Sequence, residues 1–243
     1  MTTRSDPAHA AAARRHFALI PAAGIGARIG TEVPKQYLPL AGKPMLRHVL
    51  DTFRSSPLVA HTFVVVSPDD GHIDAVVADV AHEGRGGVTV LRVGGATRHQ
   101  SVQNGLEAIR ASARDDDRVL VHDAARPGLT PALIEKLIRT LQGDETGGLL
   151  ALPVVDTLKR ADGDGRVAAT VPREALWSAQ TPQMFGYALL RRALAQADSV
   201  TDEASAVEAL GLRPKLVEGS PRNFKITMAQ DLALAELFIK GLA

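Results

Sequence analysis

The segment Leu19-Ile-Pro-Ala-Ala-Gly-Ile-Gly-Ala-Arg-Ile-Gly-Thr-Glu-Val-Pro-Lys-Gln-Tyr-Leu-Pro-Leu40 begins as a strand and continues as a loop of small residues. The apolar run Phe17 to Ile20 predicts a buried strand, which Pro21 ends. The small residues after it end in Gly24 and Gly26, and two cations follow, Arg28 and Lys35. Small residues let backbone N–H groups approach a phosphate closely, and fixed cations neutralise its charge. The segment therefore predicts a nucleotide phosphate site.

This loop does not match the common nucleotide-binding motifs. The pattern Gly24-x-Gly26-x-x-x-Gly30 misses the dinucleotide-binding spacing by one residue. Ser67 and Pro68 stand where a dinucleotide-binding fold has its acidic residue. A Walker A motif is absent from the sequence. A tight turn with solvated cations is the plain alternative, but such a turn does not need two cations.

Strand-like and helix-like segments alternate along the first part of the chain. Apolar, mostly β-branched runs predict further strands at 63–66, 88–91 and 119–121. Apolar residues at helical spacing predict helices that begin near Pro44, Ile73, Val102 and Leu133. This repeated alternation predicts a three-layer α/β fold, a mainly parallel twisted sheet with helices on both faces. Because ligands bind beyond the carboxyl ends of such strands, the loops after Ile20, Leu91 and Val121 are expected at one rim.

The pattern changes after a strand predicted at 149–155. The turn signal Asp162-Gly-Asp-Gly165 lies between two short extended segments in 156–173, which predicts a hairpin. Its flanks hold few large apolar residues, so we expect it to project as an arm of about residues 154–175. Such a hairpin either moves as a flap or docks on another subunit. Docking is favoured here, because an isolated hairpin is only marginally stable in water.

The remainder of the chain returns to α/β character. We expect helices at 187–197 and 202–210 and strands at 215–217 and 224–226. The last helix is expected to open at Thr227 with a capping box, because Gln230 follows three residues later. Without an internal repeat or a linker, 17–243 is predicted to be one domain.

The composition excludes several classes of protein. The chain has 243 residues, 45% of them hydrophobic, which is enough for a full core. Its 28 basic and 27 acidic residues nearly cancel, so neither nucleic acid nor a membrane surface is an expected partner. Cysteine is absent, which excludes disulfides and thiolate metal sites and fits a cytoplasmic protein. Residues 1–16 have no apolar core and are predicted to be a disordered tail.

Asp123 directly follows the expected strand 119–121, at the rim where ligands are expected. A carboxylate there can hold Mg²⁺ or a ribose hydroxyl. Alternatively, Asp123 caps the next turn or pairs with Arg126. The eight histidines show no pair at ligand spacing, and Gly-x-Ser-x-Gly is absent, which argues against a protein-built zinc site and a nucleophile-elbow hydrolase.

Three more polar residues stand where they either bind an anion or serve the fold alone. Arg98 and Ser101 follow Gly94-Gly95 at an expected helix start, where they bind phosphate or cap the helix. Lys225 lies in the expected strand 224–226, and its charge faces either solvent or a site.

Several motifs resemble those of the 2-C-methyl-D-erythritol 4-phosphate cytidylyltransferases, a family of nucleotidylyltransferases in the non-mevalonate isoprenoid route. The general signature is Pro21-Ala-Ala-Gly-Ile-Gly-Ala-Arg28 with Pro34-Lys-Gln-Tyr37. The motifs more specific to the family are His122-Asp-Ala-Ala-Arg-Pro127, Asp156-Thr-Leu-Lys159, Thr181-Pro-Gln183, Thr201-Asp-Glu-Ala-Ser205 and Asn223-Phe-Lys225. The resemblance spans about 17–237 and implies a Rossmann-like nucleotidyltransferase fold with a β-hairpin arm.

The resemblance implies transfer of CMP from CTP to 2-C-methyl-D-erythritol 4-phosphate, with Mg²⁺ as cofactor, in a homodimer joined by the arm. The implied catalytic residues are Arg28, Lys35, Arg173 and Lys225. The implied CTP contacts are Pro21, Ala22, Ala23, Gly24, Gly26, Gly95, Arg98, Ser101, Asp123 and Ala124. The implied polyol phosphate contacts are Asp123, Arg126, Thr157, Arg173, Thr181, Thr201 and Lys225, with Asp123 also at the metal. One departure is Ala96, where the family often has an acidic residue.

Two other functions are weighed against this one. A ribitol 5-phosphate cytidylyltransferase would share the fold, CTP and the mechanism, but Ala124-Ala125 favours the erythritol enzyme. A nucleotide-binding regulatory module without turnover would not need cations at a reacting centre. The residues that argue against it are Arg28, Lys35, Asp123 and Lys225.

Overall fold

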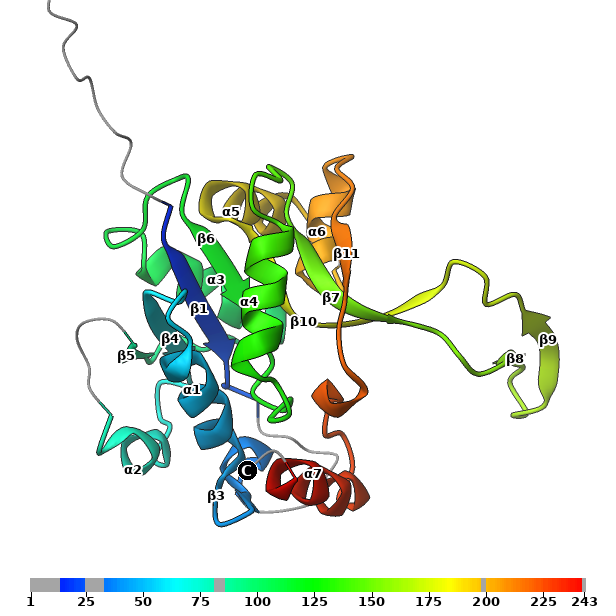
Figure 1. Cartoon of the computed structure of the whole chain (residues 1–243), viewed down its shortest axis with the longest axis horizontal. Coiled ribbons are helices and arrows are strands. Elements are labelled where there is room, and N and C mark those ends of the chain that lie inside the picture. The colour runs from blue at the N-terminus through cyan, green and yellow to red at the C-terminus, as the bar shows by residue number, and fades with distance from the viewer. Residues whose placement is uncertain (1–13, 25–32, 81–85, 198–199, 242–243) are drawn as a thin grey trace, which may run out of the picture.

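A seven-stranded sheet forms the centre of the molecule, and helices cover both of its faces (Figure 1). The computed structural model describes residues 14–24, 33–80, 86–197 and 200–241. The strands lie in the order β11 (Lys215–Glu218), β7 (Gly148–Pro153), β10 (Trp177–Gly186), β6 (Arg118–Val121), β1 (His16–Pro21), β4 (His61–Val65) and β5 (Gly87–Leu91).

The helices divide into two layers according to the core that they help to build. One core receives side chains from α1 (Met45–Ser55), α2 (Ile73–Val77) and α4 (Pro131–Thr140). The other receives side chains from α3 (Arg98–Ala108), α5 (Tyr187–Gln196) and α6 (Glu203–Ala209). The predicted three-layer α/β fold is therefore confirmed.

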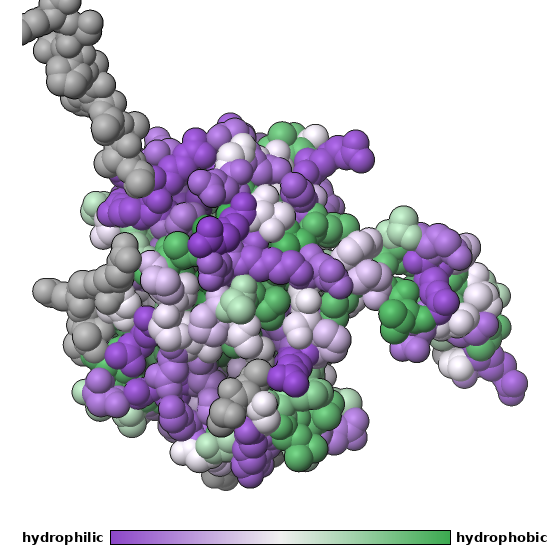
Figure 2. Space-filling view, viewed as in Figure 1, coloured by the Kyte–Doolittle hydropathy of each residue, from purple (hydrophilic) through white to green (hydrophobic). Residues whose placement is uncertain are grey.

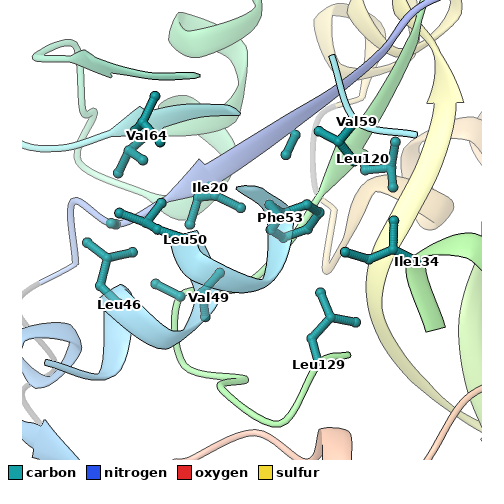
Figure 3. Packing of buried hydrophobic residues seen from close by; sticks show 14 of the residues in the cluster. Ile20, Leu46, Val49, Leu50, Phe53, Val59, Val64, Leu120, Leu129 and Ile134 are labelled. Carbon is teal, nitrogen blue, oxygen red and sulfur yellow. The ribbon is translucent and has the colours of Figure 1, made fainter. Parts of the chain in front are cut away.

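Strand β1 contributes to both cores because successive side chains of a strand point to opposite faces. Ile20 packs with α1 residues such as Leu50 and Phe53 in the first core (Figure 3). Its neighbour Leu19 belongs to the second core, and both side chains are fully buried. This explains why the run is wholly apolar rather than alternating.

The predicted parallel strands pair as expected. Strand β1 is parallel to both β4 and β6, with Leu19 opposite Phe63 on one side and Val121 on the other. Strand β5 is parallel to β4. Strand β4 lies on one side of β1 and β6 lies on the other. The carboxyl end of β1 is therefore a topological switch point, where such sheets bind ligands.

Strand β10 was not predicted, although it lies inside the sheet and runs antiparallel to both β6 and β7. Its middle residues Gln180, Thr181 and Gln183 are polar and buried, so they interrupt the apolar pattern of a central strand. The register with β7 also shifts between Ala179 and Gln183. Local periodicity therefore gave no signal for this strand.

Two predictions near the chain ends are wrong. His16 belongs to β1 and pairs with Arg118, so the predicted tail overlaps the sheet; residues 1–13 of that tail lie outside the described residues. Residues 224–226 are not a strand: they follow the short 3-10 helix η3 (Pro221–Asn223) in an extended segment. The Ile226 N–H donates to the Ala125 carbonyl (2.8 Å), which ties this segment to the loop after β6.

The last helix, α7 (Gln230–Lys240), has no capping box at Thr227. Instead, the carboxylate of Asp231 accepts the backbone N–H groups of Thr227 (2.7 Å) and Met228 (2.9 Å). Near it lie the 3-10 turn η2 (Lys35–Tyr37) and a small hairpin of β2 (Pro39–Leu40) and β3 (Lys43–Pro44).

The predicted hairpin forms and projects from the side of the molecule (Figure 1). Strands β8 (Leu158–Ala161) and β9 (Val167–Val171) make an antiparallel sheet of their own. The Asp162 side chain closes the turn by accepting the N–H groups of Asp164 (3.0 Å) and Arg166 (2.8 Å). Separately, none of the helices in the described part of the chain has the length and apolar character to cross a membrane.

Candidate active site

The loops after β1, β5 and β6 meet around one cavity of about 630 Å³. The prediction that these three loops share a rim is therefore confirmed. The extended segment after η3 closes the cavity from the C-terminal side. The lining residues are Pro21, Ala22, Ala23, Gly24, Lys35, Gln36, Gly95, Ala96, Thr97, Arg98, Ser101, Asp123, Ala124, Ala125, Lys225 and Thr227.

Most of the residues predicted to bind the nucleotide line this cavity. Gly26 and Arg28 lie outside the described residues. Five residues predicted to bind the polyol phosphate are not among the described residues that line it: Arg126, Thr157, Arg173, Thr181 and Thr201. The structure thus joins the nucleotide half of the predicted site and leaves much of the substrate half apart from it.

Asp123 is the electrostatic centre of the site. Its Oδ2 lies 2.9 Å from Lys225 Nζ and 3.6 Å from Arg126 Nε, and its Oδ1 lies 2.9 Å from Arg98 Nε. Burial would raise the pKa of Asp123, but the charges of Arg98 and Lys225 outweigh it and hold the pKa well below its usual range. The carboxylate is therefore ionised across the physiological pH range.

Two buried side chains fix the backbone at Asp123. Its N–H donates to Thr181 Oγ1 (3.0 Å), which lies 2.9 Å from His122 Nδ1. Burial lowers the pKa of His122 to about 4, so its ring is neutral at neutral pH. Because the Arg126 carbonyl can only accept, His122 Nε2 donates to it (3.2 Å). Nδ1 of the neutral ring is then an acceptor, and the Thr181 hydroxyl donates to it. Thr181 thus supports the loop from β10 instead of lining the cavity.

Two lysines line the cavity. Lys35, at the start of η2, donates to the Ile226 carbonyl (3.2 Å). Lys225 pairs with Asp123, and its side chain is 38% exposed, which leaves room for an anion. Arg126 is not among the described residues that line the cavity: its Nε lies 3.6 Å from Asp123 Oδ2, and its Nη1 donates to the Asn223 carbonyl (2.8 Å).

The small residues of the loops are required by close backbone approach. A Cβ at Gly94 would lie 2.4 Å from Ala23 Cβ, so the loops after β1 and β5 touch there. The Gly95 N–H donates to Ser101 Oγ (3.1 Å), while Thr97 caps α3 by accepting from the Gln100 N–H (3.1 Å). Ser101 is therefore not the cap of α3.

Gln36 was missed by the sequence analysis. Its side chain is buried, and its Nε2 donates to the Ala22 carbonyl (2.7 Å), which holds the loop after β1 against η2. Its position directly after Lys35 in the quoted motif was the available signal.

The predicted arm residues lie on the projecting segment. Arg173 donates to the Val155 carbonyl across the base of the arm.

Thr201, also predicted to bind the polyol phosphate, is exposed at the start of α6, where its N–H donates to Ser205 Oγ (3.2 Å).

The acidic side chains fit only one mode of Mg²⁺ binding. Within the described residues, no group of three or more His, Cys, Asp or Glu side chains is placed to hold a metal ion. Among the described residues that line the cavity, Asp123 is the one acidic residue. Mg²⁺ is commonly held by one or two carboxylates together with substrate phosphates and water, and this site fits that mode but not a protein-built cage.

A mainly parallel α/β sheet with a small-residue loop, two lysines and one carboxylate at its carboxyl edge defines the nucleotidyltransferase class. The chain belongs to the 2-C-methyl-D-erythritol 4-phosphate cytidylyltransferase family, whose family model matches residues 16–241. It is therefore a cytidylyltransferase of isoprenoid biosynthesis, as the sequence predicted. The match favours this activity over a ribitol 5-phosphate enzyme and over a regulatory module.

Individual relatives agree with this assignment. A 2-C-methyl-D-erythritol 4-phosphate cytidylyltransferase of Azoarcus sp. is 56% identical over 230 residues, which cover 93% of this chain and 95% of that protein. A solved 4-diphosphocytidyl-2C-methyl-D-erythritol synthase is 44% identical, with a TM-score of 0.83 and coverage of 94% and 100%. The Thermus thermophilus cytidylyltransferase structure is 37% identical, with a TM-score of 0.74 and coverage of 93% and 99%.

Proposed function

We propose that the cavity binds CTP beside 2-C-methyl-D-erythritol 4-phosphate, whose phosphate attacks the α-phosphorus of CTP. Pyrophosphate would leave, and 4-diphosphocytidyl-2-C-methyl-D-erythritol would form. The observation that carries the proposal is the arrangement of Lys35, Lys225 and Asp123 around one cavity, beside the small-residue loop that follows β1.

The chemistry of the nucleophile explains why such a site needs cations more than a base. A phosphate monoester has a second pKa of about 6 and is mostly dianionic at pH 7, so no proton has to be removed. The difficulty is that one anion must approach another. Two unit charges about 4 Å apart repel by about 4 kcal/mol at an effective dielectric of 20. Catalysis would therefore rest on positioning and on compensating charge.

On the nucleotide side, backbone groups of the loop after β1 would cradle the triphosphate, and Lys35 would stabilise the charge that develops on it. The contacts proposed for CTP are Pro21, Ala22, Ala23, Gly24, Gly95, Arg98, Ser101, Asp123 and Ala124, all of which line the cavity. Gly26 and Arg28 are proposed on their place in the motif alone. Because Ala96 carries no polar group, backbone groups would have to replace an acidic contact there.

On the substrate side, Lys225 would bind the attacking phosphate. Its ammonium is held by Asp123 Oδ2 and is partly exposed, which places a positive charge at the cavity without burying it. Arg126, Thr181 and Thr201 stay proposals for this half. The bonds of Arg126 to the Asn223 carbonyl and of Thr181 to Asp123 favour supporting roles for these two.

Mg²⁺ would be held by Asp123 together with phosphate oxygens of CTP. When bound, it would supply positive charge to the triphosphate. The fit rests on a carboxylate that stays ionised, which the flanking cations ensure. Lys225, held at Asp123 Oδ2, would at the same time direct its remaining N–H groups to the incoming phosphate.

We also propose that the chain works as a homodimer joined through the arm. Val155 and Val167 of the arm are 74% and 64% exposed, more than expected for an arm that stays in water. Figure 2 shows apolar surface on this segment, apart from the body of the molecule. Thr157 and Arg173 would then reach the substrate half of the partner's cavity.

A pyrophosphate-release assay tests the reaction. The purified chain is given Mg²⁺, each of the four nucleoside triphosphates, and either methylerythritol phosphate or ribitol 5-phosphate. We expect kcat/KM for CTP with methylerythritol phosphate to exceed every other combination by at least about 100-fold. Comparable rates with ribitol 5-phosphate would contradict the proposed substrate. EDTA should abolish turnover and added Mg²⁺ restore it, whereas turnover in excess EDTA would contradict the metal.

A further inference from the structure

Glu203 is a buried carboxylate that the reaction as proposed does not use. It lies in the first turn of α6 and is 1% exposed, and it is not among the described residues that line the cavity. Its Oε1 and Oε2 accept from Arg98 Nη1 (2.6 Å) and Nη2 (3.0 Å). A bidentate pair of this kind is among the strongest polar contacts in proteins, and it fixes the orientation of the guanidinium group.

Arg98 connects Glu203 to the centre of the site. Because the guanidinium is planar, binding both Nη atoms to Glu203 also sets the direction in which Nε–H points. That N–H donates to Asp123 Oδ1 (2.9 Å). Asp123 Oδ2 is thereby left for Lys225, at 2.9 Å. The order of charges is therefore Glu203, Arg98, Asp123, Lys225.

The backbone on both sides of Glu203 is fixed. Asp202 caps α6 by accepting the Ser205 N–H (2.9 Å). Gln183 of β10 donates to Asp202 Oδ2 (2.8 Å) and accepts the Ala204 N–H (2.8 Å). Strand β10 also carries Thr181, which holds the backbone of Asp123. One strand thus supports the backbone at both carboxylates of the charge series, Glu203 and Asp123.

We propose that Glu203 is a positioning residue for the transfer: it orients Arg98 so that Arg98 contacts only Oδ1 of Asp123 and leaves Oδ2 to Lys225. Without the Glu203 charge, the two Nη groups of Arg98 are free to take both oxygens of Asp123 as a fork. Lys225 then loses its partner and the attacking phosphate loses a fixed cation. This inference rests on the roles proposed above for Asp123 and Lys225.

The first test is Glu203→Gln, which keeps the size of the side chain, removes its charge and turns an NH2 group toward the guanidinium. We expect kcat/KM for methylerythritol phosphate to fall at least about tenfold, while KM for CTP changes less than about threefold. The control is Glu208→Gln, the same change at an exposed position of the same helix, which should leave both values within about twofold of wild type.

A double-mutant cycle separates positioning from a merely structural role. If Glu203 acts through Arg98, then Glu203→Gln adds less than about twofold to the loss caused by Arg98→Met. If the two single-variant losses multiply in the double variant, the proposal is overturned. It is also overturned if the smaller fraction of folded protein accounts for the whole loss in Glu203→Gln. If Glu203→Gln does not fold, Glu203→Asp replaces it, because the shorter side chain cannot hold both Nη groups of Arg98 in this geometry. We expect the same split between the two substrates, and wild-type constants would overturn the proposal.

Asp123→Asn distinguishes failure of this inference from failure of the proposed function. Wild-type activity in Asp123→Asn would contradict the role of Asp123 itself and remove the premise. An inactive Asp123→Asn beside a fully active Glu203→Gln would overturn the positioning role alone.

Discussion

His122 makes the stability of the fold dependent on pH. Its pKa is lowered to about 4 by burial, whereas the unfolded chain has the ordinary value of 6.5. Below pH 6.5 the unfolded state therefore binds a proton at His122 that the folded state does not bind. The free energy of unfolding accordingly falls as the pH falls from 6.5 to 4. The shift corresponds to about 3 kcal/mol for this buried ring. His16 acts with the same sign, because burial also lowers its pKa.

This predicts that His122→Gln flattens the pH dependence. The free energy of unfolding, measured in urea between pH 6.5 and 4.5, should fall less steeply in the variant than in wild type. The slopes should differ by up to about 1.4 kcal/mol per pH unit, the effect of one proton. The comparison concerns slopes, so a general loss of stability in the variant does not disturb it. Equal slopes would show that His122 is protonated in the folded protein.

Lys35 carries the clearest prediction for the reaction itself. Its ammonium lines the cavity at the base of the loop after β1 and donates to the Ile226 carbonyl. If it stabilises charge that develops during transfer, Lys35→Ala should lower kcat about 100- to 1000-fold. KM for CTP should change less than about fivefold. Lys43→Ala, which removes a surface partner of Asp51, should leave kcat unchanged. An equal loss in both variants would remove Lys35 from the mechanism.

At the scale of elements, the loop after β6 and the 3-10 helix η3 pack backbone against backbone. A Cβ at Gly128 would lie 1.9 Å from the Arg222 carbonyl oxygen, so any side chain there must force the two segments apart. We expect Gly128→Ala to lower the free energy of unfolding by at least about 2 kcal/mol. Activity should fall with it, because the displaced segment leads directly to Lys225.

Gly71→Ala is the matched control, since nothing lies within 4 Å of the added Cβ there. It should change the free energy of unfolding by no more than about 0.5 kcal/mol. Urea titrations of the two variants and wild type make the comparison. A Gly128→Ala protein as stable as the Gly71→Ala protein would mean that the two segments are not in close contact.

The sequence predicted those elements whose buried side chains form a regular apolar pattern within the element itself. Strand β1 and helix α4 are examples, because each shows its contact with the core in its own residues. Strand β10 could not be found this way, since its buried Gln180 and Gln183 are satisfied by residues distant in sequence. The prediction of a strand at 224–226 was wrong for a similar reason. The hydrogen bond that holds this segment, from the Ile226 N–H to the Ala125 carbonyl, is a long-range contact.

The candidate site likewise has parts that the sequence predicted and parts that depend on long-range contacts. The loops at strand ends were predicted because topology brings them together, whatever their side chains do. The connection from Glu203 through Arg98 to Asp123 depends on a fold that joins positions 105 and 25 residues apart. The motif that contains Glu203 was visible in the sequence, but the partner of its carboxylate was not.

At the scale of the whole molecule, the arm decides whether a site is built by one chain or by two. Arg173 is on the arm, Lys225 is at the cavity, and the arm projects away from the body (Figure 1). If the arm serves the partner's site, the two residues of one site belong to different chains. Arg173→Ala and Lys225→Ala chains should then each be inactive alone. A heterodimer of the two would contain one site with both defects and one intact site.

We therefore expect such heterodimers, isolated through a different tag on each chain, to recover about half of the wild-type activity per dimer. Arg166→Ala, an exposed change on the same hairpin, should be active alone and serves as the control for the arm. If the arm serves its own chain, every site of the heterodimer keeps one defect and activity stays at the level of the parents. If the chain is monomeric, no doubly tagged species is recovered. Only the first outcome makes a second copy of this chain part of the active site.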